Sequence, residues 1–129
     1  MPHIIAEYSA NLEDRLDAGR LVADLHQAAI ETGIAELVGI RTRAVRREHF
    51  RVADGHPANG FVHITARLRR GRTAEARKAL GRALLAAADR CLAEVYLAHG
   101  IGLTVEIHEI DPDMTFRRNT LRERAQQVA

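Results

Sequence analysis

The strongest constraint on the fold is that the chain presents the same order of apolar segments twice. In the first half, the mostly apolar run at residues 2–9 predicts a strand. Apolar residues at helical spacing follow from Leu12 to about Thr32, and Gly33 stands where a C-cap glycine belongs. Residues 36–50 then predict a second strand, so the first half has the order strand, helix, strand.

The second half repeats this order. Residues 60–68 predict a strand, and Thr73 is the expected N-cap of a helix whose apolar stripe ends before Gly100. Residues 101–110 predict another strand, because Leu, Val and Ile alternate there with polar residues. Residues 115–121 predict a short edge strand, and we expect the arginine-rich tail after them to be loose.

A local echo indicates an internal duplication. One predicted helix ends in Thr32-Gly33-Ile34 and the other in His99-Gly100-Ile101, and each leads into a strand. We therefore predict an α/β (α+β) fold in which residues 1–129 form one domain of two β-α-β halves, about 1–56 and 57–129. Right-handed crossovers make the strands parallel within each half and place both helices on one face of a mixed sheet. The other face is left bare, and we expect other subunits to bury it.

Composition narrows the class of protein. Aromatic residues are only 4% of the chain, so aliphatic side chains must fill the core. No run of about 18 apolar residues predicts a membrane span, and the early acidic residues argue against a signal peptide. The single cysteine, Cys91, excludes an internal disulfide framework and a multi-cysteine zinc site. These features favour a cytoplasmic protein that does not bind membranes.

Common catalytic motifs are missing from the sequence. It contains no GxGxxG, Walker A, HExxH or GxSxG pattern. Seven histidines are present without a familiar ligand spacing, so we expect no metal site, and His63 and His108 are interpreted as packed or interface residues. Cys91 lies on a helix stripe and is interpreted as a small buried hydrophobe.

Pro2 is the one unusual candidate for chemistry. Methionine is normally removed before a small second residue, and its removal gives Pro2 a free secondary amine. An α-amino group titrates at about 7.7–8, and nearby cations or an apolar pocket lower this pKa further. A neutral amine at about pH 7 is a general base. If Met1 stays, the nitrogen is an amide, and Pro2 merely opens a strand.

Arginine dominates the basic residues. Eighteen of the 19 are Arg, and the exception is Lys78. Arg makes bidentate contacts with carboxylate or phosphate that Lys makes less well. The formal net charge is only +2, however, so composition alone establishes no anionic ligand.

Several segments together resemble one family. The chain carries, in order, MPHIIAEYS, TGIAELVGIRTR, VADG, FVHIT, GRT and VEIHEIDPDMTFRRN. In these segments and their separations the chain resembles the 5-carboxymethyl-2-hydroxymuconate Δ-isomerases of the tautomerase superfamily. The resemblance extends over nearly the whole chain, and GIRTR and FVHIT are its most specific parts.

The resemblance implies a definite activity. Members of the family are homotrimers without a metal or organic cofactor, and they act in the bacterial breakdown of homoprotocatechuate. They move a proton between carbons of an unsaturated 2-hydroxy or 2-oxo carboxylate, which shifts a double bond. Carried over by position, Pro2 is the catalytic base, and Arg41 and Arg72 match the family's arginine positions.

The chemistry of the substrate extends these assignments. A di- or tricarboxylate needs fixed cations, so Arg41, Arg43 and Arg72 are the expected substrate-binding residues. A cation beside the developing dienolate also stabilises it, which gives Arg41 and Arg72 a catalytic role. Phe61, His3 and His63 are candidates for the pocket wall.

Two alternatives remain open at this stage. A related tautomerase or dehalogenase acting on another 2-oxo or 2-enol acid would use nearly the same site. A non-catalytic anion-binding module would use the arginine-rich segments without chemistry. Binding to nucleic acid is not expected, because the net charge is low and no nucleic-acid-binding motif is present.

Overall fold

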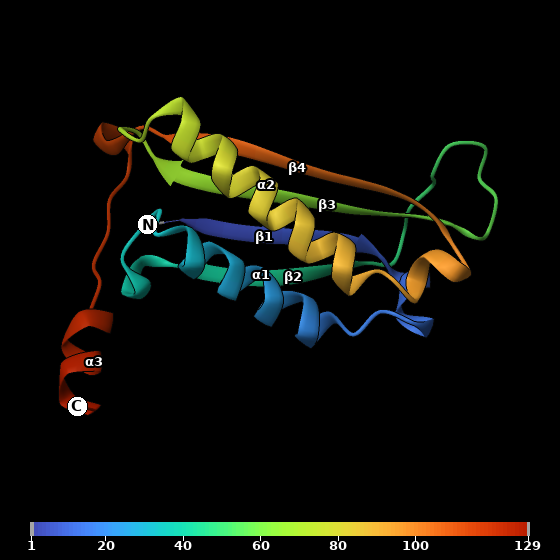
Figure 1. Cartoon of the computed structure of the whole chain (residues 1–129), viewed down its shortest axis with the longest axis horizontal. Helices are drawn as coiled ribbons and strands as arrows, with labels where there is room; N and C mark the ends of the chain where they lie inside the picture. The colour runs from blue at the N-terminus through green and yellow to red at the C-terminus, as the bar shows by residue number, and fades with distance from the viewer. Residues whose placement is uncertain (1, 129) are drawn as a thin grey trace.

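Four strands form one mixed sheet in the order β2-β1-β3-β4 in the computed structural model, which describes residues 2–128 (Figure 1). The strands are β1 (His3–Ser9), β2 (Arg41–Arg47), β3 (Asn59–Arg69) and β4 (Gly100–Ile110). β1 is parallel to β2, and β3 is parallel to β4. β1 and β3 run antiparallel, with His3 opposite Arg67. The predicted pair of β-α-β units is therefore confirmed, and β1 and β3 join the two halves.

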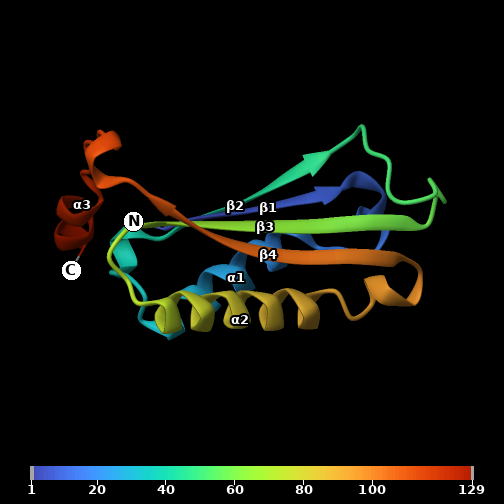
Figure 2. The ribbon, with the colours of Figure 1, turned by 90° about the horizontal axis from the view of Figure 1, so that it is seen from above.

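Two helices cover one face of this sheet, as predicted (Figure 2). They are α1 (Ala18–Thr32) and α2 (Ala74–Cys91). The hydroxyl of Thr73 caps α2 by accepting a hydrogen bond from the backbone N–H of Ala76 at 3.1 Å. Gly33 ends α1 with a left-handed φ of 69°, a conformation that glycine adopts without strain. Both cap predictions are confirmed.

The core lies between the helices and the sheet and is almost entirely aliphatic. Alternate residues of β1 and β3 point toward the helices, and Ile4, Val62 and Ile64 among them are completely buried. Leu21 of α1 and Leu80 of α2 are equally buried on the helix side. The free thiol of Cys91 is buried at the end of α2, and burial raises its pKa. This confirms its interpretation as a small hydrophobe.

The first helix begins later than predicted. Leu12 lies in a short 3-10 helix, η1 (Ala10–Asp14), and α1 starts only after the N-cap Asp17, whose carboxylate accepts from Arg20 N at 3.1 Å. Leu12 is completely buried, but it packs beside Gly60 of β3. Leu12 is therefore apolar because it packs against a residue distant in sequence. The spacing of apolar residues in the first half alone did not show this contact.

Two other predicted boundaries were wrong. The second strand begins at Arg41, because the 3-10 helix η2 (Leu37–Gly39) comes before it. Gly100 is the first residue of β4 and does not end a helix, since α2 stops at Cys91 and a 3-10 helix, η3 (Val95–Leu97), follows. Both 3-10 helices contain apolar residues. For this reason the second strand was predicted to begin too early and the second helix to end too late.

The C-terminal prediction was also wrong. Residues 115–120 form no strand, and the tail folds as a third helix, α3 (Leu121–Val128), preceded by the 3-10 helix η4 (Pro112–Met114). α3 lies beyond the end of the sheet, away from the layer formed by α1 and α2 (Figure 1). An ion pair between Arg122 and Glu36 links it to the segment before η2. This contact across the end of the sheet replaces the edge pairing that we expected.

No helix among residues 2–128 covers the second face of the sheet (Figure 2). Most of its side chains are polar, and several of them are paired with one another. Arg47 donates to Glu7 at 2.9 Å, and Glu106 contacts His63 at 2.5 Å and His108 at 3.0 Å. The bare face is therefore confirmed, and its surface consists largely of charged and hydrogen-bonding groups.

Gly60 is required where β3 passes η1. A Cβ atom at this position would lie 2.5 Å from Leu12 Cδ2 and 2.8 Å from Ser9 Oγ, both on buried residues. We expect Gly60→Ala to destabilise the fold by about 1–3 kcal/mol through overpacking, as measured by chemical denaturation. Gly102→Ala is the matched control, because nothing lies within 4 Å of a Cβ there. Equal stability of the two variants would contradict the expected overpacking.

Candidate active site

The internal duplication creates two ends at which a site could form. Each half begins with a strand, and because β1 and β3 are antiparallel, their starts lie at opposite ends of the sheet. Pro2 precedes one start, and Asn59 is the first residue of the other. The two ends differ in how completely side chains close them.

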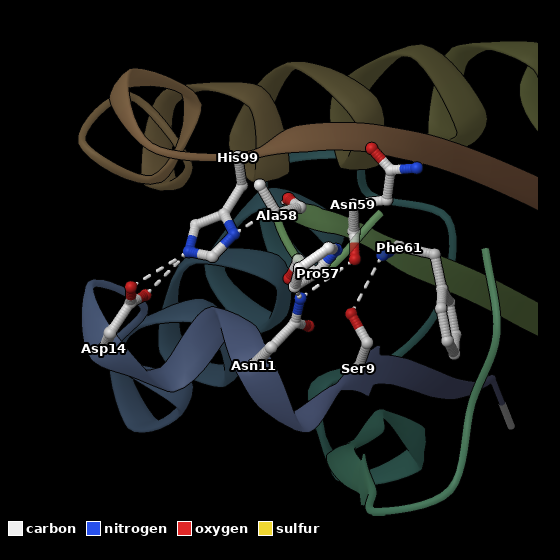
Figure 3. Close-up of polar contacts among 8 residues, drawn as sticks. All are labelled: Ser9, Asn11, Asp14, Pro57, Ala58, Asn59, Phe61 and His99. Atoms are coloured by element: carbon white, nitrogen blue, oxygen red, sulfur yellow. Dashed lines mark hydrogen bonds and ion pairs between the residues drawn. The ribbon is translucent and has the colours of Figure 1, made fainter. Parts of the chain in front are cut away.

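The end at Asn59 is filled by side chains of η1 and the loops around it (Figure 3). The amide of Asn11 donates to the carbonyls of Pro57 at 3.1 Å and Asn59 at 2.8 Å. The imidazole of His99 lies between the carbonyl of Ala58, at 3.0 Å, and the carboxylate of Asp14, at 2.9 Å. These contacts close this end with protein groups.

Ser9 contributes to the same closure. Its completely buried hydroxyl accepts a hydrogen bond from the backbone N–H of Phe61 at 3.0 Å (Figure 3). Its nearest polar partner is thus a backbone amide, which gives it a structural role. Phe61 itself lies at this end of the molecule, so within one chain it does not form the wall of a pocket near Pro2.

The end at Pro2 carries two adjoining pockets. The Pro2 side chain is fully buried, and its carbonyl accepts from the backbone N–H of Arg41 at 3.0 Å. The larger pocket has a volume of about 540 Å³ and is lined by Ala35, Glu36, Val38, Gly39, Arg69, Arg72, Arg117, Asn119, Arg122 and Glu123. The smaller one, of about 180 Å³, is lined by His3, Arg69, Ile110, Pro112, Thr115 and Arg117. Pro2 therefore lies at the same end of the sheet as both pockets, and its neighbour in sequence, His3, borders the smaller one.

Arg72 lines the larger pocket from the turn that leads into α2. Its Nε donates to the carbonyl of Ile34 at 3.0 Å, and one terminal nitrogen donates to the carbonyl of Arg69 at 2.9 Å. These two bonds hold the guanidinium between the two β-α-β units. Because a guanidinium carries five N–H donors, the remaining ones are available to an anion in the pocket.

The other two predicted arginines lie next to β1. Arg41 begins β2 and donates to the carbonyl of Gly39 at 3.3 Å, whereas Arg43 contacts Nδ1 of His3 at 3.1 Å. Register and alternation place Arg41 and Arg43 together on the uncovered face of the sheet. Neither residue is among those that line the two pockets.

His3 lies in a positive electrostatic environment at the end of the sheet where β1 begins. Burial is the largest cause of its pKa being lower than usual. The charges of Arg43, Arg41 and Arg67 lower the pKa of His3 further, because they oppose its protonation. The same field acts on any amine in the neighbouring residue.

The two histidines expected in the pocket wall had different outcomes. His3 borders the smaller pocket, as predicted. His63 borders neither pocket and contacts Glu106 on the uncovered face. Arg69 and Arg117 border both pockets, although the sequence pattern did not indicate either residue. Arg117 lies in VEIHEIDPDMTFRRN, one of the segments that carried the resemblance, but its neighbourhood was expected to be a strand or a loose tail.

Two findings apply to the described part of the chain, residues 2–128. It contains no group of three or more His, Cys, Asp or Glu side chains arranged to hold a metal ion. None of its helices combines the length and hydropathy needed to cross a membrane.

Comparisons with known proteins agree with this arrangement. The family model for 5-carboxymethyl-2-hydroxymuconate isomerase matches residues 2–125. The 5-carboxymethyl-2-hydroxymuconate Delta-isomerase of Escherichia coli is 31% identical over 121 residues, which is 94% of this chain and 96% of that protein.

Solved structures show the same fold. A 5-carboxymethyl-2-hydroxymuconate isomerase from Deinococcus radiodurans R1 superposes with a TM-score of 0.88 at 30% identity, covering 96% of this chain and 93% of that one. A fused 4-OT wild-type symmetric trimer is more distant, with a TM-score of 0.67 at 20% identity, and covers 91% of this chain and 93% of that one. The mixed sheet with its duplicated β-α-β order is thus a tautomerase fold.

Proposed function

Because the chain belongs to the 5-carboxymethyl-2-hydroxymuconate isomerase family, we propose that it catalyses this isomerisation with Pro2 as the base. The substrate would be 5-carboxymethyl-2-hydroxymuconate, in the degradation of homoprotocatechuate, and the reaction a 1,3-proton transfer without metal or organic cofactor. The observation that carries the proposal is that Pro2, directly before β1, lies at the end of the sheet that carries the two pockets lined by arginines.

The first requirement is a neutral amine at Pro2. Removal of Met1 frees the secondary amine, whose ordinary α-amino pKa of about 7.7–8 leaves it largely protonated at neutral pH. Burial and the arginines that lower the pKa of His3 act in the same direction on the adjacent proline, since its protonated form is also a cation. The fraction of neutral base at about pH 7 rises accordingly.

The proton then moves in two steps that balance. From the 2-hydroxy form, the neutral nitrogen of Pro2 removes the hydroxyl proton, and the electron pair of the broken O–H bond gives a dienolate. From the 2-oxo tautomer it removes a proton from C3 instead, and the electron pair of that C–H bond delocalises onto the 2-oxygen as the same dienolate. The protonated amine returns this proton to the other end of the conjugated system, which shifts the double bond and restores the neutral base. No redox partner is needed, and the proline acts as both acceptor and donor.

Arginines would bind the substrate and stabilise the dienolate. The guanidinium of Arg72 lines the larger pocket and is oriented by two backbone carbonyls, so little reorganisation is needed when it binds a carboxylate. Arg41 and Arg43 would supply positive potential from the uncovered face, beside β1. We assign Arg72 to the reacting end of the substrate on these grounds, with Arg41 as its partner.

The same proposal includes a homotrimer in the cytoplasm. The uncovered face offers complementary groups for another copy, because it carries both acidic and basic side chains, such as Glu106 and Arg67. A trimeric protein of the same fold, the fused 4-OT, supports this assembly. Light scattering of the purified protein would measure the number of subunits.

A panel of substrates tests the activity. We expect the highest kcat/KM with 5-carboxymethyl-2-hydroxymuconate, measured by ultraviolet absorbance and corrected for the rate in buffer alone. The enol of phenylpyruvate and 3-chloroacrylate, which represent related tautomerase and dehalogenase activities, should react more slowly. Faster turnover of either one would replace the proposed substrate, and binding of these acids without any turnover would indicate an anion-binding module.

A further inference from the structure

The C-terminal segment brings an arginine to the site. After β4 the chain turns through η4, and residues 115–120 then pass the end of the sheet at which β1 begins (Figure 1). Arg117, in the middle of this segment, borders both pockets, and Arg69 at the end of β3 is the other residue that does so. These two side chains therefore flank the junction between the pockets.

The segment is held on both sides of Arg117. Before it, the hydroxyl of Thr115 donates to the carbonyl of Asp111 at 2.9 Å. After it, Asn119 accepts from the backbone N–H of Leu121 at 2.8 Å, and Arg122 of α3 pairs with Glu36. Arg117 is thus carried past the pockets by a segment with defined contacts at both ends.

Both guanidinium groups are available for a ligand. Among residues 2–128, the side chains of Arg69 and Arg117 form neither a hydrogen bond nor an ion pair, whereas Arg72 already donates to two carbonyls and Arg122 is paired with Glu36. The larger pocket is lined by four arginines and only two glutamates, and one of these glutamates is neutralised by Arg122. Two unpaired arginines beside one junction are suited to bind a carboxylate.

We propose that Arg69 and Arg117 together bind the third carboxylate of the substrate, and so make the site selective for a tricarboxylate. This inference rests on the proposed function, in which 5-carboxymethyl-2-hydroxymuconate carries one carboxymethyl group more than the dicarboxylate 2-hydroxymuconate. Arg72 then binds the reacting end of the substrate, and Arg69 and Arg117 bind the carboxylate of its carboxymethyl group. Both are specificity-determining residues, since the proton transfer itself does not involve them.

Selectivity is the quantity to measure. We expect Arg69→Gln and Arg117→Gln each to lower the ratio of kcat/KM for 5-carboxymethyl-2-hydroxymuconate to kcat/KM for 2-hydroxymuconate by about 10-fold or more, mainly through KM. Arg118→Gln is the matched control, because this exposed neighbour borders neither pocket, and its ratio should equal that of the wild type. An unchanged ratio in either pocket variant would overturn the proposed pair, even if kcat/KM fell equally for both substrates.

The test of Arg69 and Arg117 can be distinguished from the test of the proposed isomerase activity. Turnover by the wild type tests the function, whatever the variants do. If the wild type converts neither substrate, calorimetric titration with propane-1,2,3-tricarboxylate and with pentanedioate still tests the pair. The pair predicts that the tricarboxylate binds the wild type about 10-fold or more tightly than either variant, with a smaller change for the dicarboxylate. Equal affinities would overturn it, and melting curves confirm that each variant is folded.

Discussion

Replacing Pro2 by alanine is expected to lower kcat by about 100-fold or more, in line with the usual contribution of a positioned general base. Alanine also permits removal of Met1, but it then presents a primary amine that lacks the ring fixing the nitrogen at the start of β1. The carbonyl that accepts from Arg41 N is retained, so the fold should remain intact. Steady-state rates with 5-carboxymethyl-2-hydroxymuconate measure the loss, and intact mass verifies the N-terminus.

Pro57→Ala provides the control for this substitution. Pro57 lies at the opposite end of the sheet, and the backbone carbonyl that accepts from Asn11 is preserved in the variant (Figure 3). Its turnover should match that of the wild type. A Pro2→Ala enzyme with nearly normal kcat would contradict the role of the proline nitrogen as base.

Replacing Arg72 by alanine is the second large effect that we expect. Loss of a charged contact to the carboxylate and the dienolate should reduce kcat/KM by about 10- to 100-fold, or roughly 1–3 kcal/mol of transition-state stabilisation. Arg72→Lys keeps the charge but loses the planar guanidinium that binds a carboxylate through two hydrogen bonds. We therefore expect it to retain only part of the activity. Kinetics of both variants on the same substrate provide the measurement.

The structural contacts of Arg72 require a stability measurement beside the kinetics. The variants also lose the hydrogen bonds to Ile34 and Arg69, so their melting curves show how much of each preparation is folded. Arg82→Ala on the exposed side of α2 is the control for removing an arginine. If folded Arg72→Ala retained the kcat/KM of the wild type, Arg72 would have no place in the site.

Much of the fold was predictable because local signals and the tertiary structure agree. The alternation in residues 101–110 and the caps at Thr73 and Gly33 each correspond to an observed feature. Leu12 shows where local patterns fail, since its burial comes from packing beside Gly60 in the other half of the chain. The tail shows the same limit, because α3 is linked to the rest of the protein through the pair of Arg122 with Glu36.

The candidate site was predictable only in part, for a similar reason. Pro2 and Arg72 belong to short motifs that carry the resemblance to the family, so sequence alone identified them as candidates. Arg69 and Arg117 become neighbours of the same pockets only when β3 and the C-terminal segment meet at one end of the sheet. That convergence depends on the order of strands and on the path of the tail, and no local spacing encodes it.

If the free amine of Pro2 moves the substrate proton, conversion depends on this nitrogen being unacylated, and two forms of the same chain test this dependence. One form has lost Met1, as confirmed by intact mass, and the other retains an additional residue that acylates the Pro2 nitrogen. Both are mixed with 5-carboxymethyl-2-hydroxymuconate, and the ultraviolet absorbance is followed. We expect rapid conversion by the first form and a loss of at least about 100-fold in the second. Equal conversion by both forms, or none by the form with free Pro2, would contradict this expectation.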